Sequence, residues 1–130
     1  MNYKRGERDM KSYRIYESCE YGIDDSNAEY ALKYDRAIRL LNDRVRKAVK
    51  EVKGDLVEQE EFSEQVHYLR TDYPGENEVE IISRKMPYIL YKKDNKLFAT
   101  VPFWSKTSYE YDEWDVKDLT MVLEEITILD

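Results

Sequence analysis

Residues 26–53 read SNAEYALKYDRAIRLLNDRVRKAVKEVK, and this stretch has the strongest periodic pattern in the chain. Its apolar residues recur at alternating intervals of three and four, the spacing of one face of an α-helix. They are Ala31, Tyr34, Ile38, Leu41, Val45, Ala48 and Val52. Ser26 and Glu29 match a capping box, and Gly54 is typical of the position just after a helix. The pattern predicts one helix over 26–53.

The apolar seam at 31–52 allows two structural roles. Such a seam either covers a hydrophobic core or pairs with a second helix in a coiled coil. A helix over 26–53 would be about 40 Å long, at 1.5 Å per residue, which is more than a small domain needs. A homodimer through the 31–52 seam is therefore a second prediction beside a core role.

The next segment, residues 56–70, is predicted to form another helix. Phe62, Val66 and Leu69 fall at helical spacing, with acidic residues between them. The alternative prediction for this segment is a strand over 65–71. Pro74 and Gly75 end the element in either case.

Residues 79–103 have the composition of a three-stranded antiparallel meander. Apolar runs at 88–91 and 97–101 flank a short polar segment that contains Asp94 and Asn95, which favour tight turns. Pro87 and Pro102 are expected at strand boundaries or edges. A further short strand is predicted near residues 11–17, where apolar and polar side chains alternate.

The last segment is predicted to be a closing helix. Asp115 could cap it, and its buried face would consist of Leu119, Val122, Leu123 and Ile126. The predicted fold is a single α+β domain over 1–130, with residues 1–9 frayed. It has a small antiparallel sheet of three to four strands with helices packed on one face, in the order β-α-(α)-β-β-β-α.

Composition excludes several classes of protein. The chain has 130 residues and a net charge of −7. It has one cysteine and one histidine, which excludes an internal disulfide and a Cys/His zinc site within one chain. Glu64 and His67 match half of a di-metal carboxylate motif, which needs that pair twice. No catalytic residues, no metal site and no cofactor are predicted, so the chain is expected not to be an enzyme.

Targeting signals are also missing from the pattern. We find no apolar run of about 18 residues, the minimum for a membrane-spanning helix, and no apolar core of a signal peptide near the first residues. The lone Cys19 fits a reducing compartment. The sequence predicts a cytoplasmic protein that does not bind membranes.

Charge is concentrated at one end of the sequence. Residues 108–130 carry eight acidic groups and one basic group, which equals the net charge of the whole chain. Aromatic and acidic residues alternate at the start of this region. Aromatic side chains can anchor an interface, and carboxylates can complement a basic partner. The predicted partner-binding residues are Tyr109, Glu110, Tyr111, Asp112, Glu113, Trp114, Asp115 and Asp118.

These features predict a non-enzymatic protein that binds another macromolecule. The expected partner is a basic protein, such as a nucleic-acid-processing enzyme. The expected role is that of an acidic inhibitor. One form is an anti-defence protein of a phage or mobile element, which could act as a nucleic-acid mimic. The other form is a toxin-immunity protein. One alternative is a nucleic-acid-binding regulator that uses the basic residues of 26–53, although direct nucleic-acid binding is disfavoured by the interleaved acids. Another is a small-ligand binder.

Overall fold

The computed structural model describes residues 9–19, 22–23, 27–71, 79–108 and 110–129. Within them, seven strands form one antiparallel sheet, and two α-helices pack on it. The strands are β1 (Asp9–Cys19), β2 (Gly22–Ile23), β3 (Glu29–Ala31), β4 (Glu80–Ser83), β5 (Ile89–Lys93), β6 (Lys96–Ser108) and β7 (Glu113–Leu129). The helices are α1 (Tyr34–Glu51) and α2 (Gln59–Thr71), with a short 3-10 turn, η3 (Lys53–Asp55), between them.

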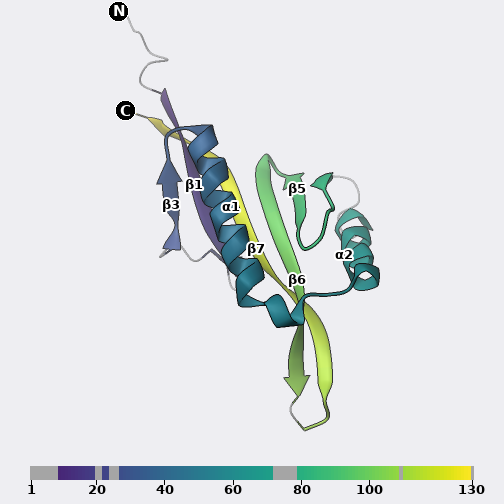
Figure 1. The fold of residues 1–130 in the computed structure, drawn as a ribbon. Coiled ribbons are helices and arrows are strands. Elements are labelled where there is room, and N and C mark those ends of the chain that lie inside the picture. The colour runs from purple at the N-terminus through teal and green to yellow at the C-terminus, as the bar shows by residue number, and fades with distance from the viewer. Residues whose placement is uncertain (1–8, 20–21, 24–26, 72–78, 109, 130) are drawn as a thin grey trace, which may run out of the picture.

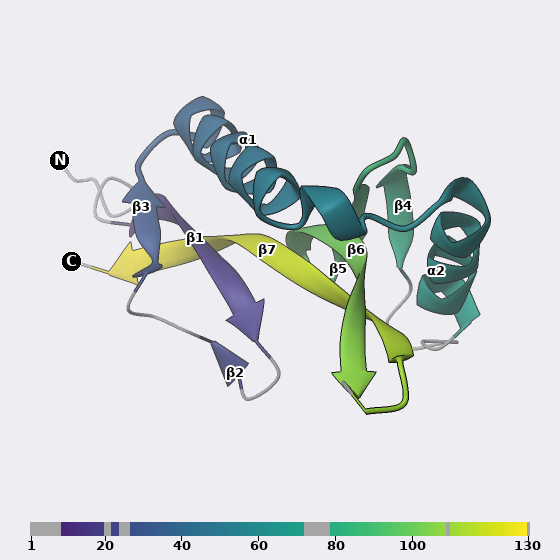
Figure 2. The same cartoon turned by 60° about the horizontal axis from the view of Figure 1, so that its bottom comes forward.

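The sheet has the order β2-β1-β7-β6-β5-β4, and β3 pairs with the same outer edge of β1 as β2. Strands β4 to β7 form a meander in which each strand pairs with the next. The N-terminal strand β1 completes the sheet by pairing with β7 from Asp9↔Leu129 to Ser18↔Thr120. Figures 1 and 2 show a twisted sheet with α1 lying along it and α2 at the end formed by β4 and β5.

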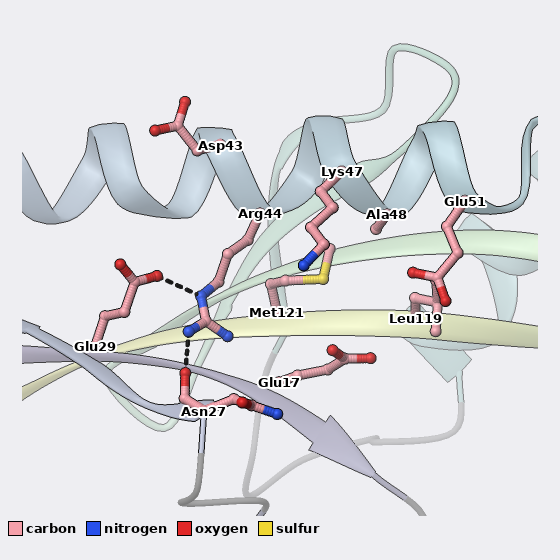
Figure 3. Close-up of a pocket in the computed structure, with 10 residues that line it drawn as sticks. All are labelled: Glu17, Asn27, Glu29, Asp43, Arg44, Lys47, Ala48, Glu51, Leu119 and Met121. Atoms are coloured by element: carbon pink, nitrogen blue, oxygen red, sulfur yellow. Dashed lines mark hydrogen bonds and ion pairs between the residues drawn. The ribbon is translucent and has the colours of Figure 1, made fainter.

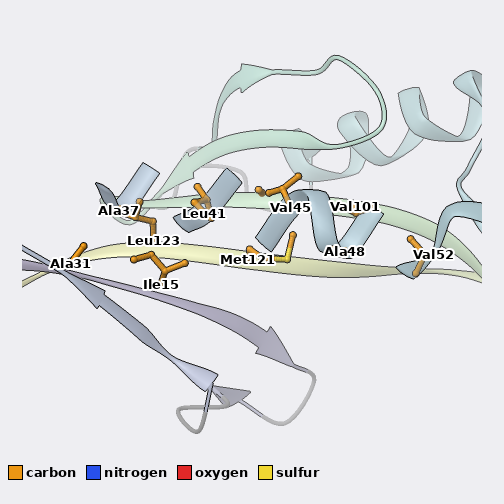
Figure 4. Packing of buried hydrophobic residues seen from close by; sticks show 11 residues of the cluster. Ile15, Ala31, Ala37, Leu41, Val45, Ala48, Val52, Val101, Met121 and Leu123 are labelled. Carbon is orange, nitrogen blue, oxygen red and sulfur yellow. The ribbon is translucent and has the colours of Figure 1, made fainter. Parts of the chain in front are cut away.

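Helix α1 covers one face of the sheet. Its buried stripe consists of Ala37, Leu41, Val45 and Ala48, which recur at helical spacing. Figure 4 shows these side chains directed at the sheet. Their partners on the strands are Ile15, Ala99, Val101, Met121 and Leu123. Most of the apolar seam therefore packs in the core of its own chain, so most of the surface predicted for a homodimer is used within the monomer, whereas Tyr34 is 51% exposed.

Helix α2 packs on the opposite face. Phe62 and Val66 of α2 lie against Ile89 and Tyr91 of β5 in a second cluster that also includes Phe98. Neighbouring residues of a strand point to opposite faces. Phe98 belongs to the α2 cluster, whereas the next residue, Ala99, belongs to the α1 cluster.

The predicted fold class is therefore wrong in two respects. The sheet has seven strands instead of three to four, and the helices lie on both faces instead of one. The helix predicted over 56–70 is present as α2, so the alternative strand over 65–71 is excluded. The meander is present too, and its β5–β6 turn has positive φ at Asp94 (52°) and Asn95 (62°), as a two-residue hairpin turn requires.

The predicted closing helix is a strand. Residues 113–129 form β7, which lies between β1 and β6. Leu119 and Leu123 face α1, whereas Val122 is buried on the other face of the sheet. A central strand that is buried on both faces has no clean alternation, so its apolar positions also fitted helical spacing.

The long helix begins later than predicted. Residues 29–31 pair with β1 as β3, which removes them from the helix, and α1 starts at Tyr34. Lys33 is the N-cap and forms no side-chain capping bond. The predicted cap, Ser26, lies outside the described residues. Pro102 lies inside β6, where β6 has a strand neighbour only on the β7 side because pairing with β5 ends at Thr100.

Candidate functional site

The β6–β7 hairpin extends beyond the rest of the sheet. The pairing of β5 with β6 ends at Thr100, and the pairing of β1 with β7 ends at Thr120. The β6–β7 pairing continues outward to Ser108↔Glu113. In Figure 1 this two-stranded segment projects below the body of the molecule. We refer to residues 105–115 as the arm.

The arm presents large aromatic side chains to solvent. Tyr111 is 71% exposed and Trp114 is 48% exposed. Large side chains with this exposure are typical of binding surfaces, where Tyr and Trp supply contact area. The structure therefore places two of the predicted partner-binding residues on the outside, whereas Trp114 would have been buried if it had fixed the start of a closing helix.

Carboxylates surround these aromatic residues. All the predicted acidic residues are exposed, namely Glu110, Asp112, Glu113, Asp115 and Asp118. Glu110 and Glu113 form no ion pair within the described residues. Asp118 accepts a hydrogen bond from the Thr120 hydroxyl at 2.6 Å, and Asp115 accepts one from the amide of Val116 at 2.8 Å, so Asp115 does not cap a helix. Tyr109 lies outside the described residues.

Local hydrogen bonds link the described residues of the tip. Asp112 adopts a positive φ of 54°, which lets the chain reverse between the two strands. The Tyr111 amide donates to the Ser108 hydroxyl, and the Thr107 hydroxyl donates to the Glu113 carbonyl, both at 3.2 Å. These bonds constrain the described residues on either side of the turn, which lowers the entropic cost of association.

Lys106 interacts with other residues of the arm. The Lys106 Nζ lies 3.2 Å from Asp112 Oδ1 and 5.7 Å from the centre of the Trp114 ring. The Trp114 indole N–H donates to the same Asp112 oxygen at 3.2 Å. Asp112 is therefore neutralised within the arm, and Glu110, Glu113 and Asp115 provide most of its negative surface.

Sequence reasoning missed the contribution of α2. The Trp104 indole N–H donates to Glu58 Oε2 at 3.1 Å, which joins the base of the arm to the start of α2. Glu60 and Glu64 on α2 are exposed as well. Acidic residues are dense in the sequence between 58 and 64, but nothing local indicates that Glu58 lies beside the base of the arm. That proximity depends on α2 packing against Trp104 and Val116.

The basic residues of α1 divide into two groups. The basic residues proposed for nucleic-acid contact are Arg36, Arg39, Arg44, Arg46, Lys47, Lys50 and Lys53. Arg36, Arg39, Arg46 and Lys50 lie exposed along α1, and Lys53 is exposed in η3, all away from the pocket described next. Arg46 pairs with Asp43. Arg44 is mostly buried and turned toward the sheet, where its Nε donates to Glu29 at 2.9 Å.

A pocket of about 360 Å³ lies beside Arg44, between α1 and the β1–β7 side of the sheet. Its walls come from α1, from Glu17 of β1 and from Asn27 and Glu29, and its floor from Leu119 and Met121 of β7. Its lining contains no tyrosine. No segment of the sequence pointed to it, because its residues come from four separate stretches.

Metal and membrane chemistry find no support in the described residues. Within them, no group of three or more His, Cys, Asp and Glu side chains is placed to hold a metal ion. His67 is exposed on α2, next to Tyr68 at 6.3 Å between ring centres. Also within the described residues, none of the helices has the length and apolar character needed to cross a bilayer.

Comparison with protein-family models, with curated proteins and with solved structures finds no match to this chain.

Proposed function

We propose that this protein acts by binding a basic protein through the arm, and that it inhibits a nucleic-acid-processing enzyme by occupying the cationic groove of that enzyme. The exposure of Tyr111 and Trp114 among the carboxylates of a projecting hairpin is the observation that carries the proposal. A narrow two-stranded projection can enter a groove that a flat surface cannot. Its aromatic residues supply contact area, and its carboxylates supply charge complementarity.

Electrostatics define how the binding should behave. The negative arm attracts a positive surface over roughly a Debye length, about 8–10 Å at moderate salt. The association rate should therefore rise at low salt, and the affinity should fall as salt is added. Adjacent carboxylates on one side of a strand, such as Glu113 and Asp115, are about 6.8 Å apart, at 3.4 Å per residue. Such a row can take the place of backbone phosphates in a nucleic-acid groove.

The proposal is tested by removing the charge of the arm without changing its shape. The test variant combines Glu110→Gln, Asp112→Asn, Glu113→Gln and Asp115→Asn. The control variant has the same net charge and changes exposed acids elsewhere, by Asp35→Asn, Asp55→Asn, Glu80→Gln and Glu125→Gln. Tagged wild-type protein and both variants are used to capture partners from host lysate, and each captured enzyme is then purified and assayed.

We expect wild type and the control variant to retain the same basic protein and to inhibit its activity on nucleic acid. The test variant should bind it at least tenfold more weakly, since several charged contacts are lost together. Equal capture and equal inhibition by a folded test variant would overturn the proposal. Direct retention of duplex DNA or RNA by wild type in a low-salt gel shift would instead favour a regulator that uses the exposed cations of α1.

A further inference from the structure

The pocket beside α1 lies where the edge of the sheet is interrupted. The outer edge of β1 pairs with β3 at residues 13–15 and with β2 at residues 18–19. Glu17 lies between these two pairings, and on the inner side it pairs with Met121 of β7. The interruption leaves space between the sheet and α1, and Figure 3 shows the lining side chains converging on it.

Arg44 forms one end of the pocket as a prepared anion receptor. Its side chain is 17% exposed, its Nε donates to Glu29, and its Nη2 donates to the Asn27 carbonyl. These bonds use one edge of the guanidinium and fix its plane. Within the described residues its Nη1 has no hydrogen-bond partner. A fixed guanidinium with an open edge matches the geometry of a carboxylate.

Three more charged side chains point into the same space without pairing. Lys47 extends from α1 toward Met121, beside Arg44 (Figure 3). Glu51 of α1 lies beside Leu119 at the other end, and Glu17 of β1, the register partner of Met121, lies between Arg44 and Glu51 (Figure 3). Within the described residues none of these three forms an ion pair or hydrogen bond. Asp43 points away from the pocket and pairs with Arg46.

Arg44, bonded to Glu29, lies at one end of the pocket and Glu51 at the other, and Lys47 and Glu17 lie between them beside Met121 (Figure 3). Leu119 and Met121 form the apolar floor, and Ala48 of α1 lies on the opposite wall. Together the three inward carboxylates (Glu17, Glu29 and Glu51) and the two cations carry a net charge of −1. The volume of about 360 Å³ falls within the range of small-molecule sites, about 300–1,000 Å³. The complementary ligand has a carboxylate at one end, an aliphatic stem and a cation at the other end.

We propose that this pocket binds a basic α-amino acid, as the free molecule or as the C-terminal residue of a peptide. The α-carboxylate lies against Arg44 and Lys47, the stem covers Leu119 and Met121, and the side-chain cation lies between Glu17 and Glu51. This site is separate from the arm, so the inference goes beyond the proposed function and does not depend on it.

The ligand chemistry is tested by titrating the full-length protein and following backbone amide resonances. L-lysine and L-arginine are compared with two truncated probes: norleucine lacks the terminal amine, and cadaverine lacks the carboxylate. We expect saturable shifts at pocket residues with both basic amino acids, and binding of each truncated probe about tenfold weaker than that of lysine. The dipeptide Gly-Lys distinguishes a free amino acid from the C-terminal residue of a peptide, because the α-nitrogen of its lysine is part of a peptide bond.

Two variants in exposed positions test the orientation of the ligand. Lys47→Gln should weaken the binding of lysine and norleucine by about tenfold and leave the binding of cadaverine unchanged. Glu51→Gln should weaken the binding of lysine and cadaverine and leave the binding of norleucine unchanged. Lys50→Gln is the control, because it removes an exposed charge from the same helix outside the pocket. The inference is overturned if no basic amino acid gives saturable shifts up to roughly 10 mM, or if all three variants affect every probe alike.

Discussion

At the scale of single residues, Glu124 is a charged side chain buried in the sheet. It is 8% exposed. Arg14 of the neighbouring strand donates to Glu124 Oε1 from Nε at 2.6 Å and also from Nη2, and the Lys96 Nζ lies 3.4 Å from Oε2. Two cations therefore compensate the cost of removing this carboxylate from water. The adjacent residue Glu125 points to the other face and forms only an exposed pair with Lys11 at 3.8 Å.

Glu124→Gln should destabilise the protein by about 1–3 kcal/mol, because two buried or partly buried cations lose their counter-charge. Glu125→Gln is the matched control and should stay within about 0.5 kcal/mol of wild type, as expected for an exposed pair. Urea denaturation at pH 7 measures both. Equal losses for the two variants would show that burial of Glu124 contributes nothing to its pairing energy.

At the scale of elements, the seam of α1 has a single structural role. Leu41 is 2% exposed and lies between the helix and the sheet, whereas Arg39 on the same helix is exposed. The periodicity of residues 31–52 correctly predicted a helix with one apolar face. It could not distinguish a core from a dimer, since both require the same spacing. The contact with Ile15, Met121 and Leu123 settles the use of that face.

Leu41→Ala should lower the free energy of unfolding by about 2–5 kcal/mol, the usual effect of a cavity in a packed core. Arg39→Ala should change it by about 0.5 kcal/mol or less. Chemical denaturation gives the stabilities, and light scattering after size-exclusion chromatography gives the mass of each variant. A folded Leu41→Ala protein that is as stable as wild type but has half its mass would contradict the core role.

At the scale of the whole molecule, the body and the arm are structurally independent. Neither hydrophobic cluster includes a residue between 106 and 114. Among the described residues, the base of the hairpin contacts the body through the bridge from Leu56 to Phe103, the hydrogen bond from Trp104 to Glu58 and the packing of Trp104 and Val116 against the α2 cluster. Because Ser105 pairs with Asp115, the two strands can be closed there by a two-residue turn.

Replacing residues 106–114 with Asn-Gly should therefore leave the fold intact. We expect a free energy of unfolding within about 1 kcal/mol of wild type and an unchanged far-ultraviolet circular dichroism spectrum apart from the lost strand residues. Binding of a basic amino acid to the pocket should persist, while binding of a basic protein should be lost. Cooperative unfolding that disappears with the arm would show that the hairpin is part of the core.

The correct predictions from the sequence concern features that depend on interactions between residues close together in the chain. The periodicity of α1 and α2, the Asp94–Asn95 turn and the meander all depend on residues close together in the chain. The exposure of the acidic, aromatic segment also followed from its polarity. Such features can be predicted from the sequence because side-chain periodicity and turn geometry depend on neighbouring residues in the chain.

Contacts between segments that are distant in the sequence determined the parts of the fold and of the pocket that the sequence did not predict. Residues 113–129 became a strand because β1 and β6 pair with its two edges, and pairing of residues 29–31 with β1 as β3 likewise removed them from the helix. The pocket brings Glu17, Asn27, Arg44 and Leu119 together only after α1 docks on the sheet. Pairing energy between strands and burial against helices depend on neighbours that are remote in the chain, so only the tertiary structure assigned these roles.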